Sequence, residues 1–148
     1  MKIHFLGATE GVTGSNYLFE TESGKILIDC GLFQGGKDET IRNWDELPYN
    51  PAEADALIMT HSHIDHIGRV PLLVKRGFKG KIYCSEPTKE FATVFLADSC
   101  HLMQNEAEFL GQPSLYDQVD VDNTIPLIET VTYHQKFSPF EGVEVEFL

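Results

Sequence analysis

The sequence has few cysteines and no long apolar run, and both features limit the classes of protein to which it can belong. It contains three cysteines in 148 residues; they are widely spaced and odd in number, so they form neither a disulfide framework nor a C-x-x-C zinc pair. No apolar stretch approaches the roughly 20 residues that cross a bilayer. Residues 2–6 follow Met1 directly and read as a strand rather than as a signal peptide. We therefore expect a cytoplasmic protein without membrane contacts.

Basic residues are also scarce. Eleven Lys and Arg stand against 23 Asp and Glu, which gives a formal net charge of −12 and argues against a polyanionic partner. However, residues 67–85 contain no acidic residue and hold five of the basic ones, namely Arg69, Lys75, Arg76, Lys79 and Lys81. This stretch could steer phosphates. Alternatively, Lys75 and Arg76 before Gly77 could mark a helix C-terminus, where cations are favoured.

Apolar patterns predict strands alternating with helices, which is typical of an α/β fold. Asp38 is a plausible N-cap, and Pro71 fits a helix only in its first turn. The last strand candidate has no turn after it, so we expect one domain, residues 1–148, that is part of a longer protein. The expected strands are 2–6, 16–20, 25–29, 56–59, 81–84, 130–133 and 143–148, and the expected helices are 38–44, 66–76 and 88–110.

Three histidines and one aspartate fall within six residues, His61-Ser62-His63-Ile64-Asp65-His66, directly after the apolar strand candidate. His61 and His63 are two residues apart, so in an extended segment they point the same way and can hold one divalent ion. Asp65 and His66 lie where the chain turns into a helix and can face a second ion. Paired ions can share a water and lower its pKa. The imidazole and carboxylate set suits zinc.

Two aspartates could support these side chains. Asp29 follows an apolar strand candidate, so its carboxylate would be partly buried and need a partner; histidine ligands commonly need such acceptors. An ordinary turn-forming aspartate is the alternative. Asp98 lies on a helical stripe with Phe91, Val94, Phe95 and Leu102 and is either a buried acceptor or part of the helix surface. The remaining histidines, His4, His101 and His134, are not expected to be ligands.

The H-S-H-I-D-H segment after Leu57-Ile58-Met59-Thr60 resembles the signature motif of the metallo-β-lactamase superfamily. Segments 5–8, 12–18 and 27–35 are similar to the opening of the β-CASP RNA-processing nucleases, and segments 98–101, 115–116 and 131–134 are also similar to that group. The resemblance covers nearly the whole chain. It implies that residues 1–148 are the N-terminal half of a four-layer αβ/βα sandwich.

The resemblance also implies a function. His61 and His63 would bind the first of two zinc ions and Asp65 and His66 the second, with Asp65 orienting a zinc-bridging hydroxide that cleaves RNA phosphodiester bonds. Asp29 would brace the metal loop. The family's third histidine and bridging aspartate are expected beyond Leu148, so residues 1–148 alone are expected to be inactive and to self-associate through uncovered apolar faces.

Two other functions are compatible with the pattern. The first keeps the metal and changes the substrate, giving a thioester, lactam or other small-molecule hydrolase. The second is a non-catalytic partner subunit of a nuclease. Such partners usually lose metal ligands, whereas this chain keeps all four that the region can supply.

Overall fold

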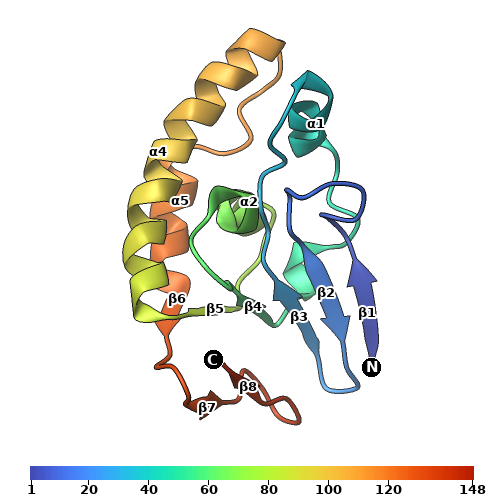
Figure 1. Cartoon of the computed structure of the whole chain (residues 1–148), viewed down its shortest axis with the longest axis vertical. Coiled ribbons are helices and arrows are strands. Elements are labelled where there is room, and N and C mark those ends of the chain that lie inside the picture. The colour runs from blue at the N-terminus through green and yellow to red at the C-terminus, as the bar shows by residue number, and fades with distance from the viewer.

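A six-stranded mixed sheet forms the centre of the computed structural model, which describes all 148 residues (Figure 1). The strands lie in chain order, β1-β2-β3-β4-β5-β6. The first three pair antiparallel, and β3 to β6 pair parallel. The predicted α/β class is confirmed. The strand bounds are β1 (Lys2–Phe5), β2 (Tyr17–Glu20), β3 (Lys25–Ile28), β4 (Ala56–Ile58), β5 (Lys81–Cys84) and β6 (Ile128–Thr130).

The connections explain the change from antiparallel to parallel pairing. A tight turn at Thr21–Gly24 joins β2 to β3, whereas parallel neighbours need longer crossovers, which here carry helices. No helix is long and apolar enough to span a membrane. The helices are α1 (Lys37–Ile41), α2 (Ile64–Ile67), α3 (Val70–Lys75), α4 (Glu86–Leu110) and α5 (Gln118–Thr124), with 3-10 turns η1 (Arg42–Trp44), η2 (Pro51–Glu53) and η3 (Ile125–Leu127).

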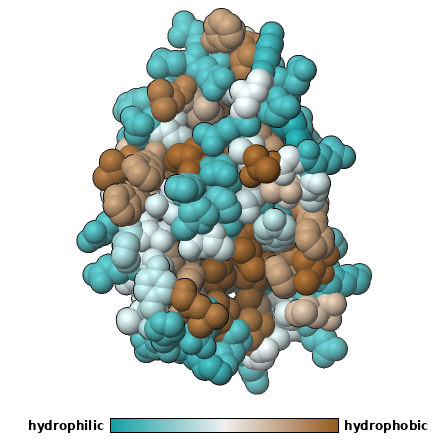
Figure 2. Space-filling model, viewed as in Figure 1, coloured by the Kyte–Doolittle hydropathy of each residue, from teal (hydrophilic) through white to brown (hydrophobic).

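The two faces of the sheet are covered differently. Alternation along the strands sends Leu27, Leu57 and Ile82 into the main core of 22 buried residues beneath the helices. On the other face, Ile26 and Ile58 lie against a small sheet of β7 (Lys136–Phe137) and β8 (Val145–Glu146). Figure 2 shows apolar side chains gathered around a hollow beside this small sheet. The second face therefore has the thinner cover.

Two helical expectations need correction. Asp38 is not an N-cap, because α1 begins at Lys37 after the extended Gly36 and places Asp38 in its first turn. Residues 66–76 are not one helix, because α2 and α3 are separated by Gly68 and Arg69. A Cβ on Gly68 would lie 2.6 Å from the Ile64 carbonyl oxygen, so only glycine allows this close turn. Pro71 lies in the first turn of α3, as expected.

The C-terminal third differs most from the prediction. The strand expected at 130–133 is shifted, since β6 is Ile128–Thr130, and the chain then turns through His134 at φ 62°. The strand expected at 143–148 is reduced to Val145–Glu146. The apolar pattern does not predict helix α5, because a reciprocal capping box between Asp117 and Asp120, rather than a strong apolar stripe, defines its start.

Candidate metal centre

The metal motif, residues 61–66, lies just beyond the C-terminal end of β4. Ligand sites of open α/β sheets commonly lie at the carboxyl ends of the strands. Met59 and Thr60 lead out of the strand, and His63 is the extended residue (φ −64°, ψ 142°) that precedes α2. The helix therefore begins inside the motif, and Asp65 falls in its first turn, where a carboxylate is favoured by the helix dipole.

The structure brings the four predicted ligands together. The ring centroid of His61 lies 4.7 Å from that of His63 and 4.0 Å from that of His66. His66 Nε2 lies 3.7 Å from Asp65 Oδ2. No three His, Cys, Asp or Glu side chains in the chain are arranged so that they could hold a metal ion. The imidazole and carboxylate donors of the motif are of the types that zinc binds.

Burial lowers the pKa of His61, and the neighbouring His66 and His63 lower it further through charge repulsion. A lowered pKa keeps this imidazole neutral at physiological pH. The neutral ring has a free nitrogen lone pair, which is the form that binds metals.

Asp29 lies beneath the motif at the end of β3, with 2% of its surface exposed. Its Oδ2 accepts from His66 Nδ1 at 2.7 Å and from Ser15 Oγ at 3.2 Å, and its Oδ1 accepts from the Thr60 backbone N–H at 2.9 Å. The backbone of Asp29 is left-handed, with φ 57°, a conformation that costs a non-glycine residue on the order of 1 kcal/mol or more. The side chain of Asn16 holds it there by donating to the Asp29 carbonyl at 2.6 Å.

Backbone hydrogen bonds fasten the loop before β2 and the loop after β3 to the motif. Ser15 N–H donates to the Asp65 carbonyl at 2.8 Å, and Cys30 N–H donates to the His66 carbonyl at 2.8 Å. Gly31 lies so close that a Cβ there would stand 1.6 Å from the Asp65 carbonyl oxygen. The position of the motif therefore depends on two loops, around Ser15 and around Cys30, that are far from it in the sequence.

Asp98 is not brought to the motif, and the interpretation of it as a buried acceptor is wrong. It is exposed on α4, and Phe91, Val94 and Leu102, which share its helical stripe in the sequence, are exposed by 54%, 63% and 58%. Smaller side chains form most of the buried stripe of α4 because they allow the helix to approach its neighbours closely. That stripe consists of Thr88, Ala92, Leu96, Ser99, Cys100, Met103 and Ala107.

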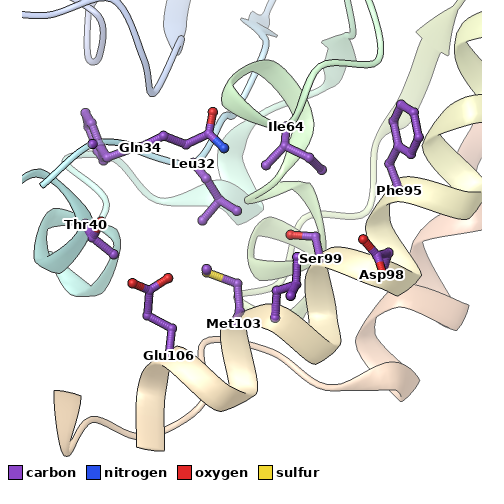
Figure 3. Close-up of a pocket in the computed structure, with 12 residues that line it drawn as sticks. Leu32, Gln34, Thr40, Ile64, Phe95, Asp98, Ser99, Met103 and Glu106 are labelled. Carbon is purple, nitrogen blue, oxygen red and sulfur yellow. The ribbon is translucent and has the colours of Figure 1, made fainter. Parts of the chain in front are cut away.

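Asp98 instead lines a hollow of about 420 Å³ between α4, α1 and the loop after β3. Figure 3 shows Phe95, Met103 and Glu106 on its α4 side, facing Gln34 across the space. Ile64 of the motif also lines the hollow, so it adjoins the metal motif without containing any of the four predicted ligands.

Three of the five basic residues in the stretch 67–85 have positions that the fold explains. Arg69 is buried; its Nε donates to the Gly31 carbonyl at 2.7 Å, and its guanidinium lies 4.7 Å from the Phe33 ring centroid. Lys75 donates to the Leu115 carbonyl at 3.1 Å and ends α3 ahead of Gly77, whose φ is 101°. Lys81 begins β5, which is parallel to β4, so it lies at the opposite end of the strands from the motif. The structure favours the helix C-terminus over phosphate steering.

The comparisons with known proteins agree with this geometry. The sequence pattern of the Metallo-beta-lactamase superfamily matches residues 9–127. Ribonuclease TTHA0252 of Thermus thermophilus is 38% identical over 103 residues, which are 70% of this chain and 23% of that protein. Transcription termination factor FttA of Methanocaldococcus jannaschii is 30% identical over 132 residues (89% and 21%). Cleavage and polyadenylation specificity factor 73 of Drosophila melanogaster is 30% identical over 141 residues (92% and 19%).

A solved structure shows the same fold. It is a metallo-beta-lactamase from Cronobacter sakazakii, a HARLDQ motif mutant, which superposes with a TM-score of 0.51 at 20% identity over 89% of this chain and 46% of that one. The chain spans about a fifth of the length of the curated relatives it matches. The resemblance identified in the sequence is confirmed: the chain belongs to the metallo-β-lactamase superfamily, and its relatives are β-CASP RNA-processing proteins.

Proposed function

We propose that this chain carries the first metal-binding motif of a zinc-dependent ribonuclease of the β-CASP type, acting in the cytoplasm. The observation that carries the proposal is the gathering of four ligand-type side chains at a strand end above the buried carboxylate of Asp29. The similarity to Ribonuclease TTHA0252 supports RNA as the substrate class.

The proposal gives each side chain a role. His61 and His63 hold one zinc ion, and Asp65 and His66 hold the other. Bound zinc would supply positive charge and a water of lowered pKa for phosphodiester hydrolysis. Asp65 helps to orient that water, and Asp29 fixes the ring of His66, since their contact of 2.7 Å leaves Nε2 of His66 free to bind.

The ligand count predicts what the chain can do alone. Hydrolytic zinc sites generally use three protein ligands per ion, whereas these residues offer two to each. We infer that the remaining ligands come from outside residues 1–148. The isolated chain should therefore bind zinc weakly and should not cleave RNA.

The isolated chain should also self-associate. Edge strand β1 pairs only with β2, and its Ile3 and Phe5 are 44% and 66% exposed. Open edges with apolar side chains favour pairing between molecules. Sedimentation velocity should detect species larger than the monomer, and the Ile3→Lys/Phe5→Lys variant should shift the distribution toward the monomer. A wild-type chain that sediments only as a monomer would contradict this part of the proposal.

The activity is tested on the intact protein that contains this chain. Zinc-loaded protein should cleave single-stranded RNA, and His61→Ala/His63→Ala should lose both bound zinc and cleavage. His101→Ala, on the exposed face of α4, is the matched control and should retain both. Unchanged zinc content in the double variant would refute the ligand assignment. Hydrolysis of thioesters or lactams with RNA left intact would refute the substrate class.

A further inference from the structure

Thr60, the residue directly before His61, contacts both Asp29 and a predicted zinc ligand. Its Oγ1 lies 3.0 Å from Oδ1 and 2.9 Å from Oδ2 of Asp29. The same oxygen lies 3.0 Å from Nδ1 of His61. One hydroxyl therefore stands between a buried carboxylate and a ring nitrogen of the metal motif.

The direction of these hydrogen bonds follows from the number of protons available. A hydroxyl has one proton to donate, and a carboxylate can only accept. If the Thr60 proton pointed to His61, a hydroxyl lone pair would face both carboxylate oxygens of Asp29 at 2.9–3.0 Å without a proton between them. The proton therefore points to Asp29. Oγ1 then offers only lone pairs to His61, so Nδ1 of His61 has to be the donor.

His66 contacts the Asp29 carboxylate directly, without an intervening hydroxyl. Its Nδ1 lies 2.7 Å from Asp29 Oδ2, so the ring is the donor and its Nε2 keeps the free lone pair. The left-handed backbone of Asp29 and the bonds from Ser15 and from the Thr60 backbone hold the carboxylate in place. A single aspartate thus faces two histidines, one directly and one through Thr60.

We propose that Thr60 is a positioning residue that transmits the hydrogen-bonding preference of Asp29 to His61. Its hydroxyl fixes a proton on Nδ1 of His61 and leaves the lone pair on Nε2, the nitrogen that then binds metal. The metal-binding consequence rests on the proposed function. Asp29 then sets the tautomer of one ligand for each of the two zinc ions, and the side-chain hydroxyl of Thr60 carries that effect to His61.

A merely structural role for Thr60 is the competing explanation, because its backbone N–H already bonds to Asp29 at 2.9 Å. Two substitutions separate the explanations. Thr60→Ser keeps the hydroxyl and the backbone bond, whereas Thr60→Val keeps the shape and the backbone bond but removes the hydroxyl. Only the tautomer of His61 distinguishes a positioning hydroxyl from a space-filling one.

The experiment is long-range ¹H–¹⁵N NMR of the histidine rings in the metal-free chain at about pH 8, above the ordinary histidine pKa of about 6.5. Wild type and Thr60→Ser should carry the His61 proton on Nδ1. In Thr60→Val, His61 should shift toward the Nε2–H form that free histidine prefers in water. His66 should stay protonated on Nδ1 in all three and serves as the internal control.

Two results would overturn the proposal: a wild-type His61 protonated on Nε2, or a Thr60→Val variant whose His61 tautomer is unchanged. The wild-type spectrum decides the proton position even if Thr60→Val does not fold. Because no metal and no RNA are present, failure of the ribonuclease assay leaves this result unaffected, and the two proposals can fail separately.

Discussion

Substituting Gly31 by alanine should be one of the most damaging single-methyl changes in this protein. The added Cβ would lie 1.6 Å from the Asp65 carbonyl oxygen, 2.0 Å from its carbon and 2.6 Å from the His66 nitrogen. All three are backbone atoms, so no flexible side chain can move aside. The loop after β3 and the metal motif would have to separate.

The size of the effect follows from what that separation breaks. Overpacking typically costs about 1–3 kcal/mol. Moving the two backbones apart also strains the bonds from Cys30 N–H to the His66 carbonyl and from Ser15 N–H to the Asp65 carbonyl, both 2.8 Å, each with a net contribution of about 1 kcal/mol. We therefore expect Gly31→Ala to lower the free energy of unfolding by about 3–5 kcal/mol.

Urea unfolding followed by circular dichroism measures this change. Gly11→Ala is the matched control, because no atom lies within 4 Å of a Cβ at that position, and it should stay within about 0.5 kcal/mol of wild type. If Gly31→Ala lost no more stability than Gly11→Ala, the close packing of the loop against the motif would be refuted.

Three further predictions concern buried groups; the first two are measured by urea unfolding and the third by the rate of reaction with a thiol reagent. Asp29→Asn should cost about 1–3 kcal/mol, because an amide nitrogen would replace an oxygen that accepts from Ser15 and His66; an unchanged urea midpoint would contradict these hydrogen bonds. Arg69→Met should cost about 2–4 kcal/mol through loss of its carbonyl bond and its aromatic contact, whereas the exposed Arg76→Met should change stability by under about 0.5 kcal/mol; equal effects would count against the buried role. All three cysteines are buried, and burial raises the pKa of Cys84 to about 12. A thiol reagent at neutral pH should therefore react slowly with the native protein, whereas in urea it should react with all three thiols. Fast reaction of any thiol in the native protein would disprove the burial.

Local patterns predicted most of the strands and the donor residues of the candidate site. The relative orientation of two histidines at spacing two after an apolar strand can be inferred from the sequence, because the strand fixes which way neighbouring side chains point. The loss of accuracy at α4 has a different cause. Phe91 and Leu102 are apolar and suitably spaced, yet they are exposed. Helix α4 packs against the neighbouring elements through smaller residues, and its position relative to those elements cannot be inferred from its own sequence.

The support beneath the motif was only partly predictable. Asp29 could be inferred from its place after a strand, but Thr60, Ser15 and Gly31 could not be assigned. The role of Thr60 depends on the parallel pairing of β3 with β4, which places Asp29 beside Thr60, 31 residues later in the chain. No property of either segment alone indicates that contact.

That pairing has a consequence for protein engineering. The H-x-H-x-D-H hexapeptide is often the visible part of such a site, and it is tempting to graft it onto another strand-to-helix junction. Here its ring orientations depend on Asp29 from the neighbouring strand and on Ser15 from a separate loop. A successful graft would have to transplant two adjacent parallel strand ends together with that loop, so the smallest portable unit is a piece of the sheet and not a peptide.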